Sequence, residues 1–219
     1  MLFKRRSVSI LTARLSLRLP EHRDFREWAK LRHQSRAFLS PWEPIWAADH
    51  LSRASFTNRV YWSQRAVKNG NAVPLFVFHK EAGQLVGAIT LDNIRRGPSQ
   101  VGTIGYWVGQ QYARQGFMSE AIIAMVAHAF GTLDLSRVES ACLPDNVASR
   151  GVLEKAGFKY EGVAQSYIQI NGRWRNHVLY AALRGDRRGR SPGAGLRRAL
   201  GGSIGQHVRA LPAHGHAPR

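Results

Sequence analysis

The chain has 219 residues, 44% of them hydrophobic, with six Trp, which suits one domain with a full core and excludes both two large domains and a disordered protein. Its formal net charge is +18, from 32 Lys and Arg against 14 Asp and Glu. This balance favours acidic partners such as RNA or a phosphate-bearing cofactor. Zinc-finger and RNA-recognition signatures are absent, so a dedicated reader of nucleic acid is not supported.

The sequence predicts a cytoplasmic protein without membrane attachment. The single cysteine, Cys142, cannot form an internal disulfide, which fits a reducing compartment. Arg14 and Arg18 interrupt the stretch where a signal peptide needs an apolar core. No window approaches the roughly 18 apolar residues of a membrane helix.

Apolar periodicity predicts a mixed α/β domain. Alternation favours a strand over Val8–Leu19, and Pro20-Glu21 is typical of a helix start, here extending to about His33. Two prolines exclude a helix between Phe38 and Trp46, and a second helix is expected over Leu51–Lys68.

The second half continues with a meander and a final hairpin. The expected elements are strands Leu75–His79, Gln84–Leu91 and Val101–Val108, a helix to Phe130, strand Arg137–Cys142, helix Asn146–Ala156, and strands Phe158–Gly162, Tyr167–Ile170 and Trp174–Leu183. Asn171-Gly172 is a two-residue hairpin signal. The folded domain is expected to span 8–185.

Residues 186–219 are expected to form a disordered basic tail. They are rich in Arg, Gly, Ala and Pro, and hold seven Arg and one Asp. Without them the net charge falls by six to +12, so the predicted domain is basic in its own right.

The stretch from Ile104 to Phe130 organises the chain. It indicates a buried strand, a polar connection and an amphipathic helix, with Gly116 directly before the helix. A glycine there permits a tight turn and leaves the first-turn amides unpaired, so that these donors and Arg114 could bind an anion such as a pyrophosphate. An ordinary strand-to-helix loop is the alternative.

This stretch resembles motif A of the GNAT superfamily of acyl-CoA N-acyltransferases, Gln/Arg-x-x-Gly-x-Gly/Ala. The motif falls on 113–118, where only Gly116 matches; Ala113 and Met118 depart from it. The wider pattern, Y-W-V-G-Q-Q-Y-x-x-Q-G-F-M-S-E-A followed by N-x-x-S-x-x-V-L-E-K-A-G-F, is similar to the ribosomal-protein-alanine N-acetyltransferases. The resemblance covers roughly Leu11 to Leu183.

The resemblance implies a single GNAT-like domain whose central sheet, flanked by helices, splays between its fourth and fifth strands. Acetyl-CoA would enter the gap, its pyrophosphate on amides near Gly116 and its acetyl carbonyl on backbone N–H groups of Val108 and its neighbours. The implied cofactor-binding residues are Tyr106, Trp107, Val108, Arg114, Gln115, Gly116, Phe117, Met118, Asn146 and Ser149.

Direct attack by an amine calls for a base, because an α-ammonium has an unperturbed pKa of about 8. Glu139, a lone acid on strand Val138–Cys142, is the first candidate, although it could simply pair with Arg137. Ser149 would protonate the departing CoA thiolate by resemblance, with Tyr160 or Tyr167 as alternatives. Asn146 and Ser149 also suit a helix N-terminus, and the two interpretations are compatible.

Candidate substrate-binding residues come from the proline-containing loop between Phe38 and Trp46 and from the last hairpin. Glu43 could bind the incoming ammonium or be a solvated loop acid, and aromatic side chains could line an acceptor pocket or merely pack. The aromatic candidates are Trp42, Trp46, Tyr167 and Trp174. The histidines are scattered, with no Cys or carboxylate at the spacing of a metal site, so no metal site is predicted. Cys142 is expected to be an inert core residue.

The favoured hypothesis is an acetyl-CoA-dependent N-acetyltransferase acting on the N-terminal amine of a protein. The expected substrate is a ribosomal protein met on the assembling particle, since a basic domain is attracted to RNA. One alternative keeps the fold and changes the acceptor to a small amine such as an antibiotic or polyamine. Another is a catalytically silent protein that binds ribosomes or RNA.

Overall fold

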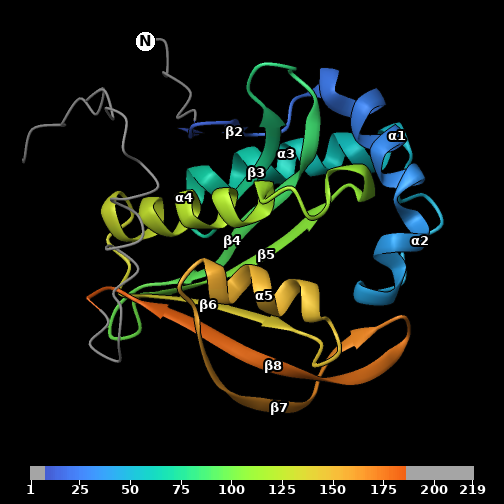
Figure 1. Ribbon diagram of the computed structural model, residues 1–219. Coiled ribbons are helices and arrows are strands. Elements are labelled where there is room, and N and C mark those ends of the chain that lie inside the picture. Colours follow the sequence, from blue (N-terminus) through green and yellow to red (C-terminus); the bar gives the residue numbers. More distant parts are fainter. Residues whose placement is uncertain (1–7, 186–219) are drawn as a thin grey trace, which may run out of the picture.

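The computed structural model describes residues 8–185, so the predicted basic tail lies outside the described residues. Its centre is one eight-stranded sheet in the order β1-β2-β3-β4-β5-β6-β8-β7 (Figure 1). The strands are β1 (Ser9–Leu11), β2 (Leu15–Arg18), β3 (Val73–His79), β4 (Leu85–Arg95), β5 (Val101–Val108), β6 (Arg137–Cys142), β7 (Lys159–Ile170) and β8 (Arg173–Leu183).

Helices cover both faces of this sheet. They are η1 (His22–Asp24), α1 (Phe25–Gln34), α2 (Arg36–Leu39), η2 (Ser40–Trp42), α3 (Arg53–Asn69), η3 (Gln110–Tyr112), α4 (Phe117–Gly131) and α5 (Val147–Lys155). The α/β class and the single-domain architecture are confirmed. In the described part of the chain, no helix is both long and apolar enough to traverse a bilayer.

The predicted first strand is wrong in its continuity. It divides into β1 and β2, which pair antiparallel with Leu11 opposite Ser16. Thr12 makes the break, because its N–H and hydroxyl donate to the carbonyl of Leu15 and its Oγ1 accepts the N–H of Leu15. Such local bonds from Thr compete with a continuous strand. The splay predicted between the fourth and fifth strands therefore lies between β5 and β6.

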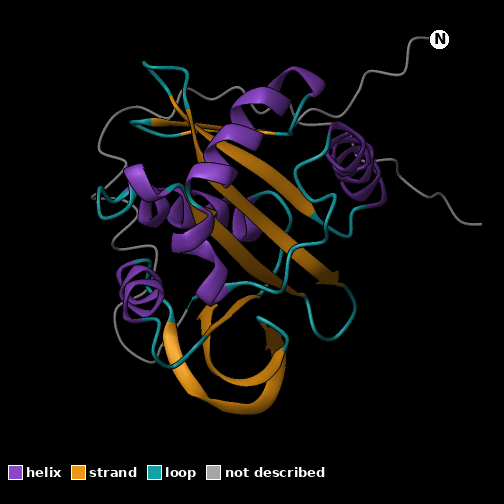
Figure 2. Cartoon of the chain, turned by 90° about the vertical axis from the view of Figure 1, so that its right-hand side faces the viewer, coloured by secondary structure: helices purple, strands orange, loops and turns teal. Residues whose placement is uncertain are grey.

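A second correction concerns the last hairpin. The segments predicted as Phe158–Gly162 and Tyr167–Ile170 belong to one long irregular strand, β7, which pairs with β8 through two register shifts. The hairpin turn itself is confirmed, since Asn171 and Gly172 both have positive φ, at 46° and 76°. These long curved strands form the bottom of the molecule in Figure 2.

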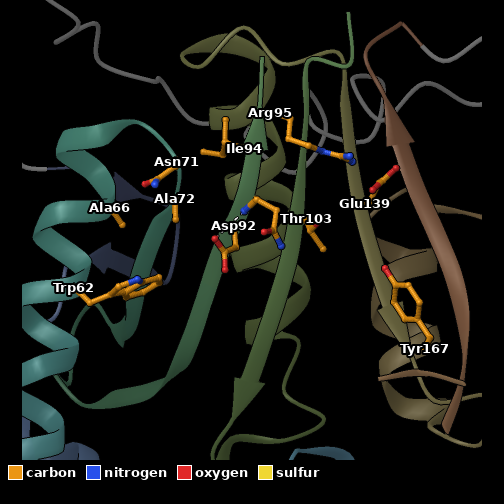
Figure 3. A pocket seen from close by; sticks show the side chains of 11 residues that line it. Trp62, Ala66, Asn71, Ala72, Asp92, Ile94, Arg95, Thr103, Glu139 and Tyr167 are labelled. Atoms are coloured by element: carbon orange, nitrogen blue, oxygen red, sulfur yellow. Dashed lines mark hydrogen bonds between the residues drawn. The ribbon is translucent and has the colours of Figure 1, made fainter. Parts of the chain in front are cut away.

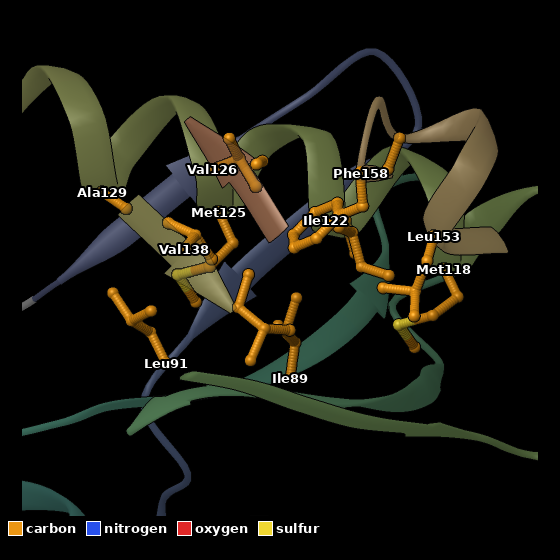
Figure 4. Packing of buried hydrophobic residues seen from close by; sticks show 14 of the residues in the cluster. Ile89, Leu91, Met118, Ile122, Met125, Val126, Ala129, Val138, Leu153 and Phe158 are labelled. Carbon is orange, nitrogen blue, oxygen red and sulfur yellow. The ribbon is translucent and has the colours of Figure 1, made fainter. Parts of the chain in front are cut away.

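Two apolar clusters lie on opposite faces of the sheet. The larger one joins α4 and α5 to the strands, through residues such as Ile122, Met125 and Val138 (Figure 4). The smaller one packs Trp28 of α1 and Phe56 of α3 against the other face. The two layers leave β5 and β6 between them, and the connection from β5 to α4 emerges at one end of the sheet (Figures 1 and 2).

Candidate active site

A slot opens where β5 and β6 stop pairing. These parallel strands are paired from Val101–Arg137 to Thr103–Glu139, but β5 continues to Val108 and β6 to Cys142. Just beyond the last pair, the hydroxyl of Ser140 donates to the carbonyl of Ile104 at 2.9 Å. A side chain thus takes the place of the next backbone bond, and the strands diverge from there.

The inner edge of β5 offers backbone groups to this slot. Gly109 donates its N–H to Val86, on the β4 side. Because successive N–H groups of a strand point to alternate sides in the plane of the sheet, the N–H of Val108 points toward β6. The splay expected from the resemblance is therefore present, with donors on its β5 side.

At the open end of the slot, the chain turns sharply into α4. Gly116, the N-cap of α4, has φ of 79°, and Arg114 also has a positive φ of 63°. No side chain caps this helix. The side chains of Phe117 and Met118 are buried in the core. Their backbone N–H groups lie in the first turn of α4, where a helix has no intrahelical acceptors for them. Arg114 and Gln115 are exposed beside it.

Arg14, between β1 and β2, contacts this turn, and sequence reasoning missed it. Its Nη1 donates to the carbonyl of Gln115 at 3.1 Å, and its Nη2 lies 3.4 Å from where a Cβ on Gly116 would stand. Glu120 holds it in place, accepting from its backbone N–H and its Nε. Burial alone would raise the pKa of Glu120, but hydrogen bonds from Thr12 and Arg14 lower it overall.

On the α4 side of the slot, β5 contacts the start of α5. The Tyr106 hydroxyl lies 2.7 Å from the Ser149 hydroxyl and 3.2 Å from the Ser149 carbonyl. Asn146 caps α5, because its Oδ1 accepts the N–H of Ser149 at 3.0 Å. The capping prediction is thus confirmed, and the amide nitrogen of Asn146 remains free of that bond.

On the opposite face, a pocket of about 440 Å³ lies between α3 and β7, over the ends of β4, β5 and β6 (Figure 3). Glu139 and Tyr167 line it, as do Asp92 and Thr103. Asp92 on β4 is opposite Thr103 on β5, which is in turn opposite Glu139 on β6. The three residues therefore lie in one row across the sheet. Asp92 was not among the sequence candidates.

Glu139 is also an ion-pair partner. Its Oε1 accepts from Arg137 Nε at 2.7 Å, and the same guanidinium pairs with Glu161. The side chain of Glu139 is 34% exposed, so it can still be reached from the pocket. The pairing interpretation and the catalytic one are therefore compatible, because Glu161 shares the positive charge.

Glu43 is engaged by its neighbours. Both carboxylate oxygens accept from Arg32, at 2.8 and 2.6 Å, and Oε2 also accepts from Trp46 Nε1. The guanidinium of Arg32 lies between the rings of Trp46 and Trp107, at 4.2 and 4.7 Å from their centroids. Glu43 therefore anchors its loop, and its oxygens are largely used before any ammonium arrives.

The other predicted substrate-binding residues lie around the same loop and the last hairpin. Asn171 donates its N–H to the carbonyl of Glu43, which joins the loop to the β7–β8 turn. Trp42 ends η2 in this loop, Tyr167 stands on β7 near His177, and Trp174 on β8 is 62% exposed. Of these aromatics, the structure brings Tyr167 to the pocket that contains Glu139.

His50, on the same loop, makes stability depend on pH. Burial, with the charges of Arg32 and Arg59, lowers its pKa to about 4. Unfolded chains bind a proton at His50 near pH 6.5 while folded chains do not, so stability should fall as pH drops from 6.5 toward 4. In His50→Gln, we expect a smaller loss of urea midpoint between pH 7 and 5 than in the unsubstituted protein. His33→Gln, on an exposed position of α1, is the control, and equal losses in all three proteins would contradict the assignment.

Cys142 and the histidines give no evidence of other chemistry. Burial raises the pKa of the Cys142 thiol, although a hydrogen bond with Ser149 acts in the opposite direction. Burial also lowers the pKa of His128. Between residues 8 and 185, no group of three or more His, Cys, Asp or Glu is placed to hold a metal ion.

The site is therefore a splayed α/β sheet with an uncapped glycine turn at the mouth of its slot. The sequence profile described as "Acetyltransferase (GNAT) domain" matches residues 14–159. The chain therefore belongs to the GNAT acetyltransferase family and is an enzyme of that class.

Characterised and annotated proteins similar to this chain include N-acetyltransferases. The [ribosomal protein uS5]-alanine N-acetyltransferase of Escherichia coli is 32% identical over 174 residues, covering 80% of this chain and 90% of the relative. A probable N-acetyltransferase of Bacillus subtilis is also 32% identical, over 163 residues, covering 74% of this chain and 90% of the relative.

Solved structures with a similar fold include ribosomal-protein acetyltransferases. Mycobacterium smegmatis RimJ in complex with CoA-disulfide superposes with a TM-score of 0.78 at 27% identity, covering 88% of this chain and 93% of RimJ. The ribosomal-protein-S5-alanine acetyltransferase of Vibrio fischeri gives 0.76 at 28% identity, covering 83% of this chain and 100% of its own.

Proposed function

We propose that this protein transfers an acetyl group from acetyl-CoA to the N-terminal α-amine of a ribosomal protein. The observation that carries the proposal is the slot between β5 and β6, which leads to the free amides of the Gly116 turn. The likeness to the Escherichia coli uS5-alanine enzyme supports the choice of acceptor. We take 8–185 as the catalytic domain.

The residues present fit coenzyme A. A diphosphate suits a helix N-terminus whose amides are unpaired, and Arg114 adds positive charge at the turn. Arg14 stands beside it, with its own charge partly offset by Glu120. The pantetheine would bind as an added strand along the free inner edge of β5, with the acetyl carbonyl accepting from Val108 or a neighbouring N–H on that edge. The remaining amide of Asn146 would contact the same arm.

In the proposed reaction, the amine attacks the thioester directly, without a covalent enzyme intermediate. One face of the slot then supplies the base, and the other supplies the hydrogen-bond donor to the leaving group. Glu139, in the pocket on the α3 side, accepts a proton from the amine, directly or through a water. Ser149, on the α4 side, donates a hydrogen bond to the departing sulfur.

The acceptor would reach the slot through the pocket of Figure 3, where Asp92 and Glu139 suit a cationic ammonium. The basic charge outside this pocket would attract ribosomal RNA rather than a free basic ribosomal protein. We therefore propose that the substrate is met on the assembling particle, in the cytoplasm.

A thiol-release assay tests the acceptor class. We expect CoA release with peptides that begin with Ala or Ser, and at least about tenfold lower kcat/KM with small amines such as polyamines and aminoglycosides, because only a peptide can extend along the pocket between α3 and β7. An N-terminally blocked peptide is the control. A preference for small amines would replace the proposed acceptor, and no release with any amine would overturn the transferase proposal.

A further inference from the structure

The hydroxyl of Tyr106 reaches across the slot to the first turn of α5. Its Oη lies 2.7 Å from Ser149 Oγ and 3.2 Å from the Ser149 carbonyl, so a side chain of β5 is bonded to the helix that follows β6. The proposed transfer uses the hydroxyl of Ser149 but assigns no role to the Tyr106 hydroxyl. Because the two hydroxyls are adjacent, Tyr106 can influence the direction in which Ser149 donates.

Two hydrogen-bond arrangements are possible for this pair. In the first, Tyr106 donates to the Ser149 carbonyl and the hydroxyl of Ser149 donates to Tyr106 Oη. In the second, Tyr106 donates to Ser149 Oγ, so the single proton of the serine hydroxyl is released from Tyr106 and can be donated to its other neighbour, Cys142, or into the slot. A negative charge that develops in the slot favours the second arrangement, because only that arrangement offers it a donor.

We propose that Tyr106 is a positioning residue that orients the Ser149 hydroxyl toward the departing sulfur of coenzyme A, so that the two hydroxyls form a hydrogen-bond chain ending on the thiolate. The proposal rests on the proposed function. As the C–S bond of the thioester breaks, its electron pair stays on sulfur, Ser149 donates to that sulfur, and Tyr106 donates to Ser149. Neither residue has to give up its proton, and the thiolate takes one from solvent on release.

The surroundings support donation by Tyr106. Burial raises its pKa, although the hydrogen bond with Ser149 acts the other way, so the phenol stays protonated at neutral pH. The other ionisable groups nearby are Cys142 and Tyr180, and Tyr180 accepts from Arg150 and donates to Glu154. Ser149 lies in the first turn of α5, whose positive end also favours a thiolate.

The first test is Tyr106→Phe, which removes the hydroxyl and keeps the ring. We expect kcat to fall by about tenfold to 100-fold while the KM for acetyl-CoA stays within about twofold, because the bond acts on the leaving group. Ser149→Ala should cost at least as much, and the double variant should be no slower than Ser149→Ala, since the chain is already broken. Tyr61→Phe, on the exposed side of α3, is the matched control. Additive losses would overturn the proposal.

The second test needs no variant. The absorbance of bound coenzyme A near the thiolate band is followed against pH and corrected with the complex of desulfo-CoA, which removes the signals of Cys142 and the tyrosines. We expect the bound thiol to titrate at least about one unit below free coenzyme A, and Tyr106→Phe to bring it back toward the free value. A bound thiol that titrates like the free one overturns the proposal, whereas failure of the unsubstituted protein to bind coenzyme A overturns the proposed function instead.

Discussion

Gly116→Val should abolish tight binding of acetyl-CoA while leaving the domain folded. A valine is strained at a φ of 79°, and its Cβ would stand 3.4 Å from the guanidinium of Arg14. Relief of that strain moves the first-turn amides that are proposed to hold the diphosphate. Loss of two hydrogen bonds to a charged group, at about 1.5–3 kcal/mol each, corresponds to a Kd about 100-fold higher or more. Isothermal titration with acetyl-CoA measures it.

The control for this substitution is Gly97→Val. Gly97 has a similar φ of 75° in the turn between β4 and β5, and a Cβ there meets no atom within 4 Å. It therefore carries the same backbone strain without touching the slot, and thermal melts of the two variants should be similar. If Gly116→Val bound acetyl-CoA as tightly as Gly97→Val, the diphosphate would not be held at this turn.

Glu139→Gln should slow acetylation by about 100-fold or more at pH 7, because a general base typically contributes 10²–10⁴. The loss should shrink as the pH rises past 8, since the α-amine of the acceptor then loses its proton without help. Glutamine can still accept from Arg137, so the strand should stay in place. The measurement is kcat against pH with an Ala-initiated peptide.

Glu161→Gln separates catalysis from the ion pair. Glu161 binds the same guanidinium of Arg137 but stands outside the pocket that contains Glu139. We expect its kcat and pH profile to match those of the unsubstituted protein. Equal losses in both variants would mean that the charge around Arg137 matters and that Glu139 is not the base. An unchanged kcat in Glu139→Gln would move the base to Asp92 or to a water.

The central stretch was predicted well because its signals are local. Apolar alternation located β5, the helical period located α4, and Gly116 before the helix indicated a turn whose φ proves to be 79°. Asn146 was a sound prediction for the same reason, since an N-cap bonds to a residue three positions away. The break at Thr12 was missed because leucine alternation continues through it.

Most of the site's connections could not be read from the sequence. Arg14 meets Gln115 from 101 residues away, and Tyr106 meets Ser149 across 43. Glu43 looked like a free loop acid, whereas the fold places it against the buried guanidinium of Arg32. Asp92 gave no signal, because only the register of β4, β5 and β6 puts it in a row with Glu139.

By itself, the sequence determined most of the helices and strands, the glycine turn and the excess of positive charge, because backbone conformation and apolar periodicity depend on neighbours within a few residues. It did not determine the break between β1 and β2, the continuity of β7 or the short helical turn Ser40–Trp42. Tertiary structure alone decided where β5 and β6 separate, which carboxylates remain reachable and which hydroxyls meet across the slot. Those features depend on contacts between distant segments, and packing, rather than local preference, selects such contacts.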